Sequence, residues 1–291
     1  MRFSFIASEK AYYPVELLCS VLGVSRSGYY AWRGRPEPSR RRRDRQLGLE
    51  VEAIYCGSFQ AYGSPRIHRE LAARGVQVGK KRVERLLRER GLSAHRPRRF
   101  RRTTDSNHAQ PIAPNLVARN FRTSAPDQVW VGDITYLRTS EGWLYLAILM
   151  DLFSRRIIGW SISPSLEQSL ALAPLDQAIA TRRPPSGLIV HHDRGVQYAG
   201  AVYQKRLQRH GLRASMSRKG DCWDNAAAES FFATLKKELV HKVRWATMTQ
   251  ARSQVADYIE NFYNRRRRHS TLGYLSPVEF ELRAEVRAAA S

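Results

Sequence analysis

The chain of 291 residues has room for about two domains, and its 49 Lys and Arg against 26 Asp and Glu give a formal net charge of +23. Such an excess of positive charge predicts a polyanionic partner, because each neutralised phosphate releases counterions. Residues 1–126 hold 26 basic and 10 acidic groups, so phosphate binding is expected mainly from the N-terminal part.

The composition also excludes several classes of protein. The cysteines Cys19, Cys56 and Cys222 lie far apart without a C-x-x-C pair, so neither a disulfide framework nor a zinc ribbon is predicted. The apolar run from Trp143 to Met150 is too short to span a bilayer. These features predict a protein of the reducing cytoplasm without a membrane partner.

Residues 1–36 are predicted to form a helix-turn-helix-like segment. Two short helices are expected over residues 13–32, with Gly23 at the turn and Ser25 as the N-cap of the second helix. The second helix could enter a DNA groove, although many helical hairpins of this pattern bind nothing. The arginine run 40–43 is expected to begin a further helix that ends near Cys56.

Residues 40–95 are predicted to form a second helical, DNA-binding domain. Ser64 with Pro65 resembles an N-cap followed by a proline at the first helical position. The next helix, over residues 79–90, has one apolar face and one basic face. The basic face carries Lys80, Lys81, Arg82, Arg85 and Arg88. Because like charges in neighbouring turns repel one another, we interpret this face as a DNA contact rather than a solvated surface.

Residues 96–126 are predicted to be a basic linker. The segment includes Arg98 and Arg99 and has prolines at 111, 114 and 126, a composition that cannot build a core. It could lie along DNA, with Arg98 and Arg99 as contacts, or be a tether without specific contacts.

Residues 127–291 are predicted to form an α/β domain. Three strands, 129–137, 143–150 and 156–162, follow one another through short connections and should be antiparallel. A helix with a capping box at Ser165 and Gln168 should follow. The remaining elements are expected as strand 187–190, helix 199–210, strand 212–217, and helices 226–239 and 249–264.

Three carboxylates lie at informative places in this domain. Asp133 lies in the middle of a strand, Asp193 follows a buried strand, and Glu229 lies near the start of a helix. Carboxylate oxygens suit Mg²⁺ or Mn²⁺, so the three acids could share divalent cations. Asp221 and Asp224 compete with Glu229 for the third position.

Three further residues of this domain are not expected to be metal ligands. Asp151 is interpreted as a turn residue. His191 and His192 are not expected to bind zinc, because adjacent strand residues point to opposite faces and a third ligand is lacking.

The ordered set Asp133 in WVGDITYL, Asp193 in HHDRGVQY and Glu229 in DNAAAESFF resembles the Asp, Asp, Glu triad of DDE transposases and retroviral integrases. It is most similar to the second-frame transposase of the insertion sequence three (IS-three) family. Asp193 and Glu229 are separated by 35 residues, the family spacing, and Lys236 lies seven residues after Glu229, where the family has a basic residue. The stretch from Tyr263 to Pro277 resembles the family's C-terminal signature.

The resemblance implies a ribonuclease-H-like integrase catalytic core behind helix-turn-helix segments. It also implies a bacterial transposase that cleaves DNA and transfers strands at the element ends with two divalent cations, Mg²⁺ or possibly Mn²⁺. Asp133 would bridge the cations, with Asp193 and Glu229 on one each. Lys236 would hold a phosphate. From its position one helical turn before Glu229, Asn225 could cap the helix or contact the scissile strand, and capping is the favoured role.

Two other functions stay open from the sequence. The chain could be a catalytically silent DNA-binding regulator of transposition, or a ribonuclease-H-like nuclease that only hydrolyses. The resemblance further implies a nucleoid-associated homo-oligomer on double-stranded DNA. A first-frame protein could supply a zipper by fusion or association, since a sustained heptad repeat is lacking here.

Overall fold

A computed structural model describes residues 1–94, 112–218 and 222–290. The chain divides into two compact units, Met1–Glu52 and Ala53–Ser291. The boundary lies inside helix α4 (Ser39–Gly57), where the sequence predicted continuous helix. Arg98, Arg99 and Asp221, which the sequence analysis named, lie outside the described residues.

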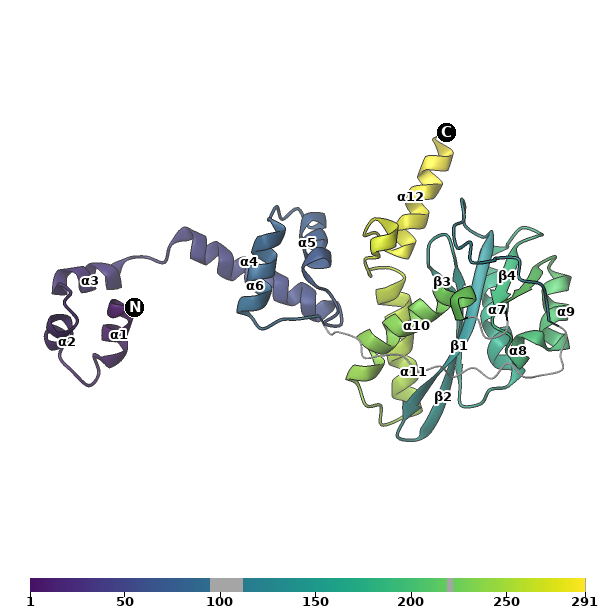
Figure 1. Cartoon of the computed structure of the whole chain (residues 1–291), viewed down its shortest axis with the longest axis horizontal. Helices are drawn as coiled ribbons and strands as arrows, with labels where there is room; N and C mark the ends of the chain where they lie inside the picture. The colour runs from purple at the N-terminus through teal and green to yellow at the C-terminus, as the bar shows by residue number, and fades with distance from the viewer. Residues whose placement is uncertain (95–111, 219–221, 291) are drawn as a thin grey trace. The chain divides into compact units, whose positions relative to one another are not determined.

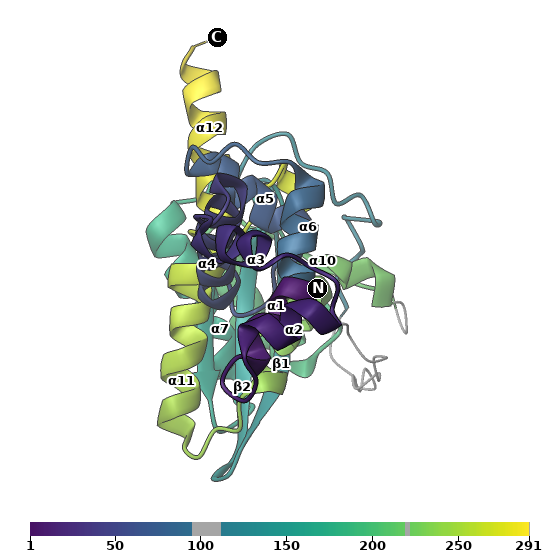
Figure 2. The ribbon, with the colours of Figure 1, turned by 90° about the vertical axis from the view of Figure 1, so that its left-hand side faces the viewer.

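The first unit contains three short helices and the start of α4 (Figures 1 and 2). Helices α2 (Val15–Val21) and α3 (Arg26–Gly34) are the predicted pair. The Ser25 hydroxyl accepts a hydrogen bond from the amide of Gly28, as an N-cap should. The prediction missed α1 (Arg2–Glu9), which lacks a side-chain cap and contributes Ile6 to a small core shared with Tyr29.

Helices α5 (Ser64–Ala73) and α6 (Lys80–Glu89) begin the second unit. The predicted N-cap at Ser64 is wrong by one residue. Gly63 occupies the cap position, and the Ser64 hydroxyl instead donates to Glu84 at 3.3 Å. The predicted apolar stripe is correct, because Val83, Leu86 and Leu87 are buried. The basic positions therefore lie on the other side of α6.

Helix α5 is tied to the C-terminal part of the same unit. Arg268 donates to Glu70 at 2.6 Å, and the Tyr62 hydroxyl accepts from the amide of Arg268 at 2.7 Å. Phe59 contacts the ring of Phe262, with centroids 4.9 Å apart. These long-range bonds group residues 53–94 with the α/β part in one compact unit.

The α/β part is built on a five-stranded sheet of order β3-β2-β1-β4-β5. Strands β1 (Val129–Thr139), β2 (Gly142–Asp151) and β3 (Ile157–Ser163) pair antiparallel, as predicted. Strands β4 (Ile189–His192) and β5 (Arg213–Met216) continue the sheet parallel to β1. Three antiparallel strands followed by two parallel strands beyond β1 make the ribonuclease-H-like topology.

One face of the sheet is covered by α7 (Gln168–Arg182), α8 (Val196–Ala199) and α9 (Ala201–Arg209) (Figure 1). The main buried cluster joins these helices to the strands. It includes Trp130, Leu149, Leu175, Val190, Tyr203 and Leu207. Helix α9 corresponds to the predicted helix 199–210, whereas the short helix α8 before Gly200 was not predicted.

Helix α7 approaches the sheet at Gly159, where a Cβ atom would lie 2.1 Å from the carbonyl oxygen of Pro174. Glycine is therefore required for this close packing. The predicted capping box at Ser165 and Gln168 is wrong. Glu167 precedes the helix without a side-chain cap, and the amide of Ser165 bonds instead to Ser163.

Beyond β5, helix α10 (Ala226–Glu238) contacts β1, and α11 (Met248–Asp257) continues as a π-helical turn, Tyr258–Tyr263. Short 3₁₀ turns lie at Cys222–Asn225, Val240–Lys242 and Ser270–Leu272. Helix α12 (Pro277–Ala289) projects from the rest of the unit and ends near the C-terminus (Figure 2). Among the described helices none is long and apolar enough to cross a membrane.

Residues 112–126 lie against the α/β part without regular structure. Val117 is buried, and the amide of Leu116 donates to the Ser215 hydroxyl at 2.9 Å. The interpretation of a tether without specific contacts is therefore wrong for this stretch. The sequence did not indicate the attachment, because hydrogen bonds of polar groups contribute to it and the stretch has no regular apolar pattern.

Candidate active site

Asp133 lies in the middle of β1, paired with Ile148 of β2. Its neighbours on the strand, Gly132 and Ile134, point to the opposite face, where Ile134 packs against the main core. The half-buried Asp133 carboxylate accepts a hydrogen bond from the amide of Ile134 at 2.8 Å. The strand therefore fixes this carboxylate on the face away from α7 to α9.

Gly132 gives room to His192 behind Asp133. A Cβ atom on Gly132 would lie 2.4 Å from Cε1 of His192. That imidazole stacks on Tyr198, with centroids 3.8 Å apart, and its Nε2 lies 2.7 Å from the Tyr203 hydroxyl. The ring is thus a buried packing element directly beneath the strand that carries Asp133.

Contacts with neighbouring side chains and backbone atoms hold the two histidines in place. The Nδ1 of His191 lies 2.8 Å from the Ser215 hydroxyl, and its Nε2 lies 3.0 Å from the carbonyl oxygen of Asp224. Burial lowers the pKa of His191 and lowers that of His192 to about 3, so both are neutral at pH 7.

Asp193 and Glu229 come from two further elements. Asp193 directly follows β4, and its carboxylate accepts from the amide of Gly195 at 3.0 Å. Glu229 is half-buried in the first turn of α10, the helix that contacts β1. A strand centre, a strand end and a helix start therefore present the three predicted acids.

The electrostatics of Asp133 show that the three carboxylates are neighbours. Burial raises the pKa of Asp133 well above its ordinary value, and the negative charges of Asp193 and then Glu229 raise it further. The Ile134 amide and the Lys236 ammonium oppose the rise. Within the described residues, no three His, Cys, Asp or Glu side chains already form a group that could hold a metal ion.

Asp224 has a structural role instead of the ligand role that was considered for it. It is fully buried and accepts hydrogen bonds from Arg218, Arg119 and Asn115. Hydrogen bonds from Arg218 hold the pKa of Asp224 far below its usual range despite burial. These bonds connect residues 115–119 to the start of α10, a long-range role that the local sequence does not indicate.

Asn225 precedes α10, but its side chain does not cap the helix. Its amide nitrogen donates to the carbonyl oxygen of Gly132 at 3.2 Å, while its Oδ1 is buried without a partner in the described structure. The favoured capping role is therefore wrong. Asn225 instead links the first turn of α10 to the residue before Asp133.

Lys236 lies two turns further along α10. Its ammonium is half-buried and lies 5.1 Å from the centre of the Tyr136 ring on β1. Burial lowers the pKa of Lys236, and the charge of Asp133 opposes that change. The lysine is thus held beside the carboxylates by an aromatic ring rather than extended into solvent.

The basic face of α6 is partly neutralised. Lys80 lies 3.8 Å from Glu84, and Arg85 donates to Glu89 at 2.8 Å, both as i,i+4 pairs. Lys81 and Arg88 are exposed. Repulsion among five cations is therefore weaker than the sequence suggested, because the acids between them lie on the same face.

The strand order defines the class of the protein as one with an integrase-type, ribonuclease-H-like core. Family models agree. Two models described as integrase core domain match residues 123–222 and 210–277, and one described as HTH-like domain matches residues 41–100.

The transposase InsF for insertion sequence IS3A of Escherichia coli (strain K12) is 46% identical over 283 residues, which cover 97% of this chain and 98% of that protein. The insertion element IS600 uncharacterized 31 kDa protein of Shigella sonnei is 44% identical over 263 residues, 90% of this chain and 97% of that protein. The chain therefore belongs to the IS3 family of insertion-sequence transposases. It is a DNA transposase of the polynucleotidyl transferase type.

Solved structures are similar at a lower level. The HTLV-2 integrase catalytic core domain in complex with magnesium has a TM-score of 0.43 and 15% identity, and covers 55% of this chain and 99% of that chain. The simian T-cell lymphotropic virus intasome in complex with PP2A regulatory subunit B56 gamma has a TM-score of 0.47 and 18% identity, and covers 75% of this chain and 74% of that chain.

Proposed function

We propose that Asp133, Asp193 and Glu229 are the catalytic residues of this transposase and hold the divalent cations on which an integrase core depends. The observation that carries the proposal is the effect of Asp193 and Glu229 on Asp133, whose pKa is raised by burial and then by both acids. Three elements bring like charges together at a cost to stability, which is typical of a catalytic site.

The donor set fits Mg²⁺ or Mn²⁺. Carboxylate oxygens are the ligands that these ions prefer, and a cation would relieve the repulsion at Asp133. When bound, two such ions would stabilise the entering and leaving oxygens of a phosphodiester. Asp133, Asp193 and Glu229 would hold these ions.

The other residues of the site position the DNA and the carboxylates. Lys236 would hold a backbone phosphate near the scissile bond, and Asn225 would keep the start of α10 against β1 through its bond to Gly132. Water would free a 3′-hydroxyl at the element end, and that hydroxyl would attack a second phosphodiester, without a covalent enzyme intermediate.

Binding of double-stranded DNA would be shared with the N-terminal helices. The exposed Lys81 and Arg88 of α6, together with Lys80, Arg82 and Arg85, would contact phosphates. Arg98 and Arg99 would extend this contact. We further propose that the active form is a homo-oligomer on DNA and that a first-frame protein assists it by fusion or association.

The test is strand transfer by the Glu229→Gln variant with labelled element ends and Mg²⁺. The amide keeps the volume of the side chain but loses the charge that holds a cation. Joining should fall by about 100-fold or more, the order of magnitude for losing one group that stabilises transition-state charge. DNA binding without metal should stay within about twofold of wild type, because a single acid at the catalytic face adds little to phosphate binding.

Glu260→Gln on the π-helical turn provides a matched control, since its carboxylate accepts from the Trp160 indole rather than facing Asp133. Near-normal joining by Glu229→Gln would contradict the assignment. A wild-type chain that cleaves ends without joining them would instead be a nuclease, and one that binds ends without cleaving them would be a regulator.

A further inference from the structure

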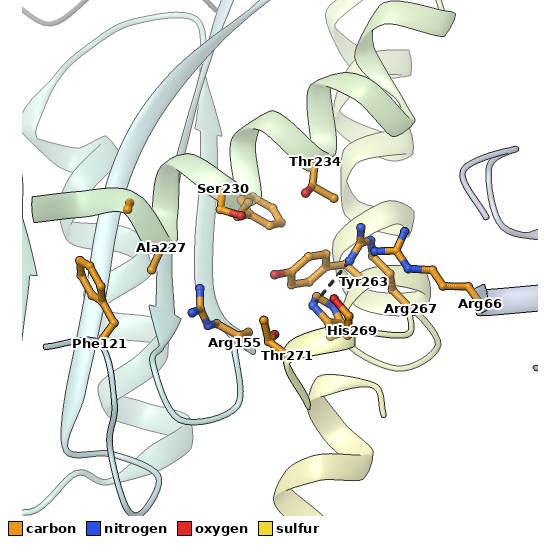
Figure 3. A pocket seen from close by; sticks show the side chains of 13 residues that line it. Arg66, Phe121, Arg155, Ala227, Ser230, Thr234, Tyr263, Arg267, His269 and Thr271 are labelled. Atoms are coloured by element: carbon orange, nitrogen blue, oxygen red, sulfur yellow. Dashed lines mark hydrogen bonds between the residues drawn. The ribbon is translucent and has the colours of Figure 1, made fainter. Parts of the chain in front are cut away.

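A pocket of about 350 Å³ lies beside α10 (Figure 3). Its walls come from α10, the C-terminal signature, the turn between β2 and β3, and α5, all in the second unit. The lining residues that matter here are Arg66, Arg155, Ser230, Tyr263, Arg267 and His269. The pocket is distinct from the carboxylate site, because Ser230 and Glu229 point about 100° apart around a helix about 10 Å wide.

The pocket has a strongly positive lining. Three arginines and one histidine line it together with the hydroxyls of Ser, Thr and Tyr side chains, and no carboxylate does within the described residues. The charge of Arg267 is already used, because its guanidinium donates to the buried Glu238 at 2.7 and 2.9 Å. Two of the three arginines, Arg66 and Arg155, are therefore the cations available to a ligand.

Neither of these two arginines has an ion pair with a described residue. Arg66 is half-buried and lies over the Tyr62 ring, and burial together with the charge of Arg267 lowers its pKa. Arg155 occupies the turn after β2 with a left-handed backbone, φ of 61°, and directs its guanidinium toward the pocket (Figure 3). A cation that is partly desolvated next to another cation is stabilised by an anion.

His269 adds an unused polar atom to the same space. The residue is only 8% exposed, and its Nε2 has no hydrogen-bond partner in the described part of the chain. Its Nδ1 lies 3.5 Å from the Arg267 guanidinium (Figure 3). A buried ring nitrogen without a partner is rare and costly unless a ligand or water satisfies it.

We propose that this pocket binds a phosphate group. A phosphate has several acceptor oxygens, which match two guanidinium groups, a ring nitrogen and the hydroxyls of Ser230 and Tyr263. The phosphate could belong to the DNA backbone or to a small anion, and the first source depends on the proposed function. The C-terminal signature would then form an anion site as well as packing the fold.

The experiment compares Arg155→Gln with Arg252→Gln in the full chain. Arg252 is exposed on α11, so the control removes the same charge outside the pocket. Binding of an end-sequence duplex is measured in EDTA across a salt series, and the melting temperature is measured with added inorganic phosphate. Arg66→Gln serves as a second pocket variant if Arg155→Gln does not fold.

A DNA phosphate in the pocket would lower the salt slope of duplex binding by about one unit for Arg155→Gln and leave it unchanged for Arg252→Gln. A small anion would instead raise the melting temperature of wild type and Arg252→Gln, but not of Arg155→Gln, with equal salt slopes. Pocket variants that match Arg252→Gln in both measurements would overturn the proposal. Glu229→Gln should keep the wild-type salt slope of duplex binding. A failure of the catalytic assignment could therefore be told apart from a failure of the phosphate-pocket proposal.

Discussion

Two carboxylates of the α/β unit, Asp133 and Glu281, lie in opposite electrostatic surroundings. Glu281 accepts hydrogen bonds from Arg182, Arg156 and Ser154, and these bonds lower its pKa although burial alone would raise it. Asp133 has Asp193 and Glu229 as acidic neighbours, with Lys236 opposing them, and its pKa is raised by burial and then by Asp193. The surroundings of the first carboxylate stabilise the fold, whereas those of the second cost stability.

The difference also explains Asp151, which the sequence placed near the end of a strand like a ligand. Its carboxylate accepts from the amides of Asp127 and Phe153, and Arg182 lies 3.5 Å away. Arg182 makes ion pairs with Asp127, Asp151 and Glu281 and so joins them into one cluster. The surroundings of a buried acid, rather than its burial, therefore distinguish a structural cluster from a candidate site.

The largest expected effect is that of Arg182→Ala. The change would leave three acids of the cluster without their shared cation, and breaking a buried ion pair costs about 3–5 kcal/mol. Denaturant unfolding should show this loss of free energy. Arg213→Ala, an exposed arginine at the start of β5, is the matched control and should change stability by less than about 0.5 kcal/mol. Equal effects for the two variants would refute the structural role of the cluster.

Asp133 and Glu281 should also give opposite pH dependences of stability. The folded pKa of Asp133 lies above its ordinary value of 3.8, so between these two values the folded state binds more protons than the unfolded state. The free energy of unfolding then falls as pH rises. The folded pKa of Glu281 lies below its ordinary value of 4.5, so its contribution is present above 4.5 and is lost as pH falls.

Unfolding of the metal-free chain in EDTA between about pH 2 and 8 tests both signs, because the contribution of Glu281 is lost only below pH 4.5. In Asp133→Asn, the free energy of unfolding should no longer fall through this group as pH rises. The variant should therefore be more stable than wild type at pH 7. Glu281→Gln should be less stable than wild type at pH 7 and approach it in acid. Asp151, with a pKa that burial raises to about 6, adds the same slope to every variant. Parallel curves for wild type and Asp133→Asn would contradict the interpretation.

The local sequence pattern was sufficient to place the three candidate acids on the correct secondary-structure elements. The apolar flanks of Asp133 and the buried run before Asp193 placed these acids correctly on β1 and after β4. The apolar face of Phe231, Phe232 and Leu235 placed Glu229 on a helix. Periodicity works here because each element buries one face against the same core.

The sequence could not show pairings between distant residues. The arginines at 265–268 form a basic run in the sequence, but Arg267 is buried against Glu238 and Arg268 pairs with Glu70. Likewise, helix capping was favoured for Asn225 from its local position. Its actual bond to Gly132 spans 93 positions and could not be seen in the local sequence. Such contacts follow from the packing of whole elements, which local propensity does not encode.

Lys236 is the cation whose charge acts on Asp133, and its replacement should give a smaller effect than the changes above. Lys236→Ala should lower the salt slope of DNA binding by about one unit and weaken strand transfer, since one phosphate contact is lost. It should also raise the pKa of Asp133 further, because Lys236 opposes that rise. Lys236→Arg should be mild, since a guanidinium keeps the charge and can also lie over Tyr136.

Lys237→Ala, the next residue of α10, is the control for helix stability and total charge. Because adjacent helical residues point about 100° apart, Lys237 does not share the position over Tyr136. Binding and joining that fall equally for the two alanine variants would assign Lys236 to the general charge of the helix. A loss confined to Lys236→Ala and restored by arginine would instead mean that the carboxylates and the DNA phosphate share one positioned cation.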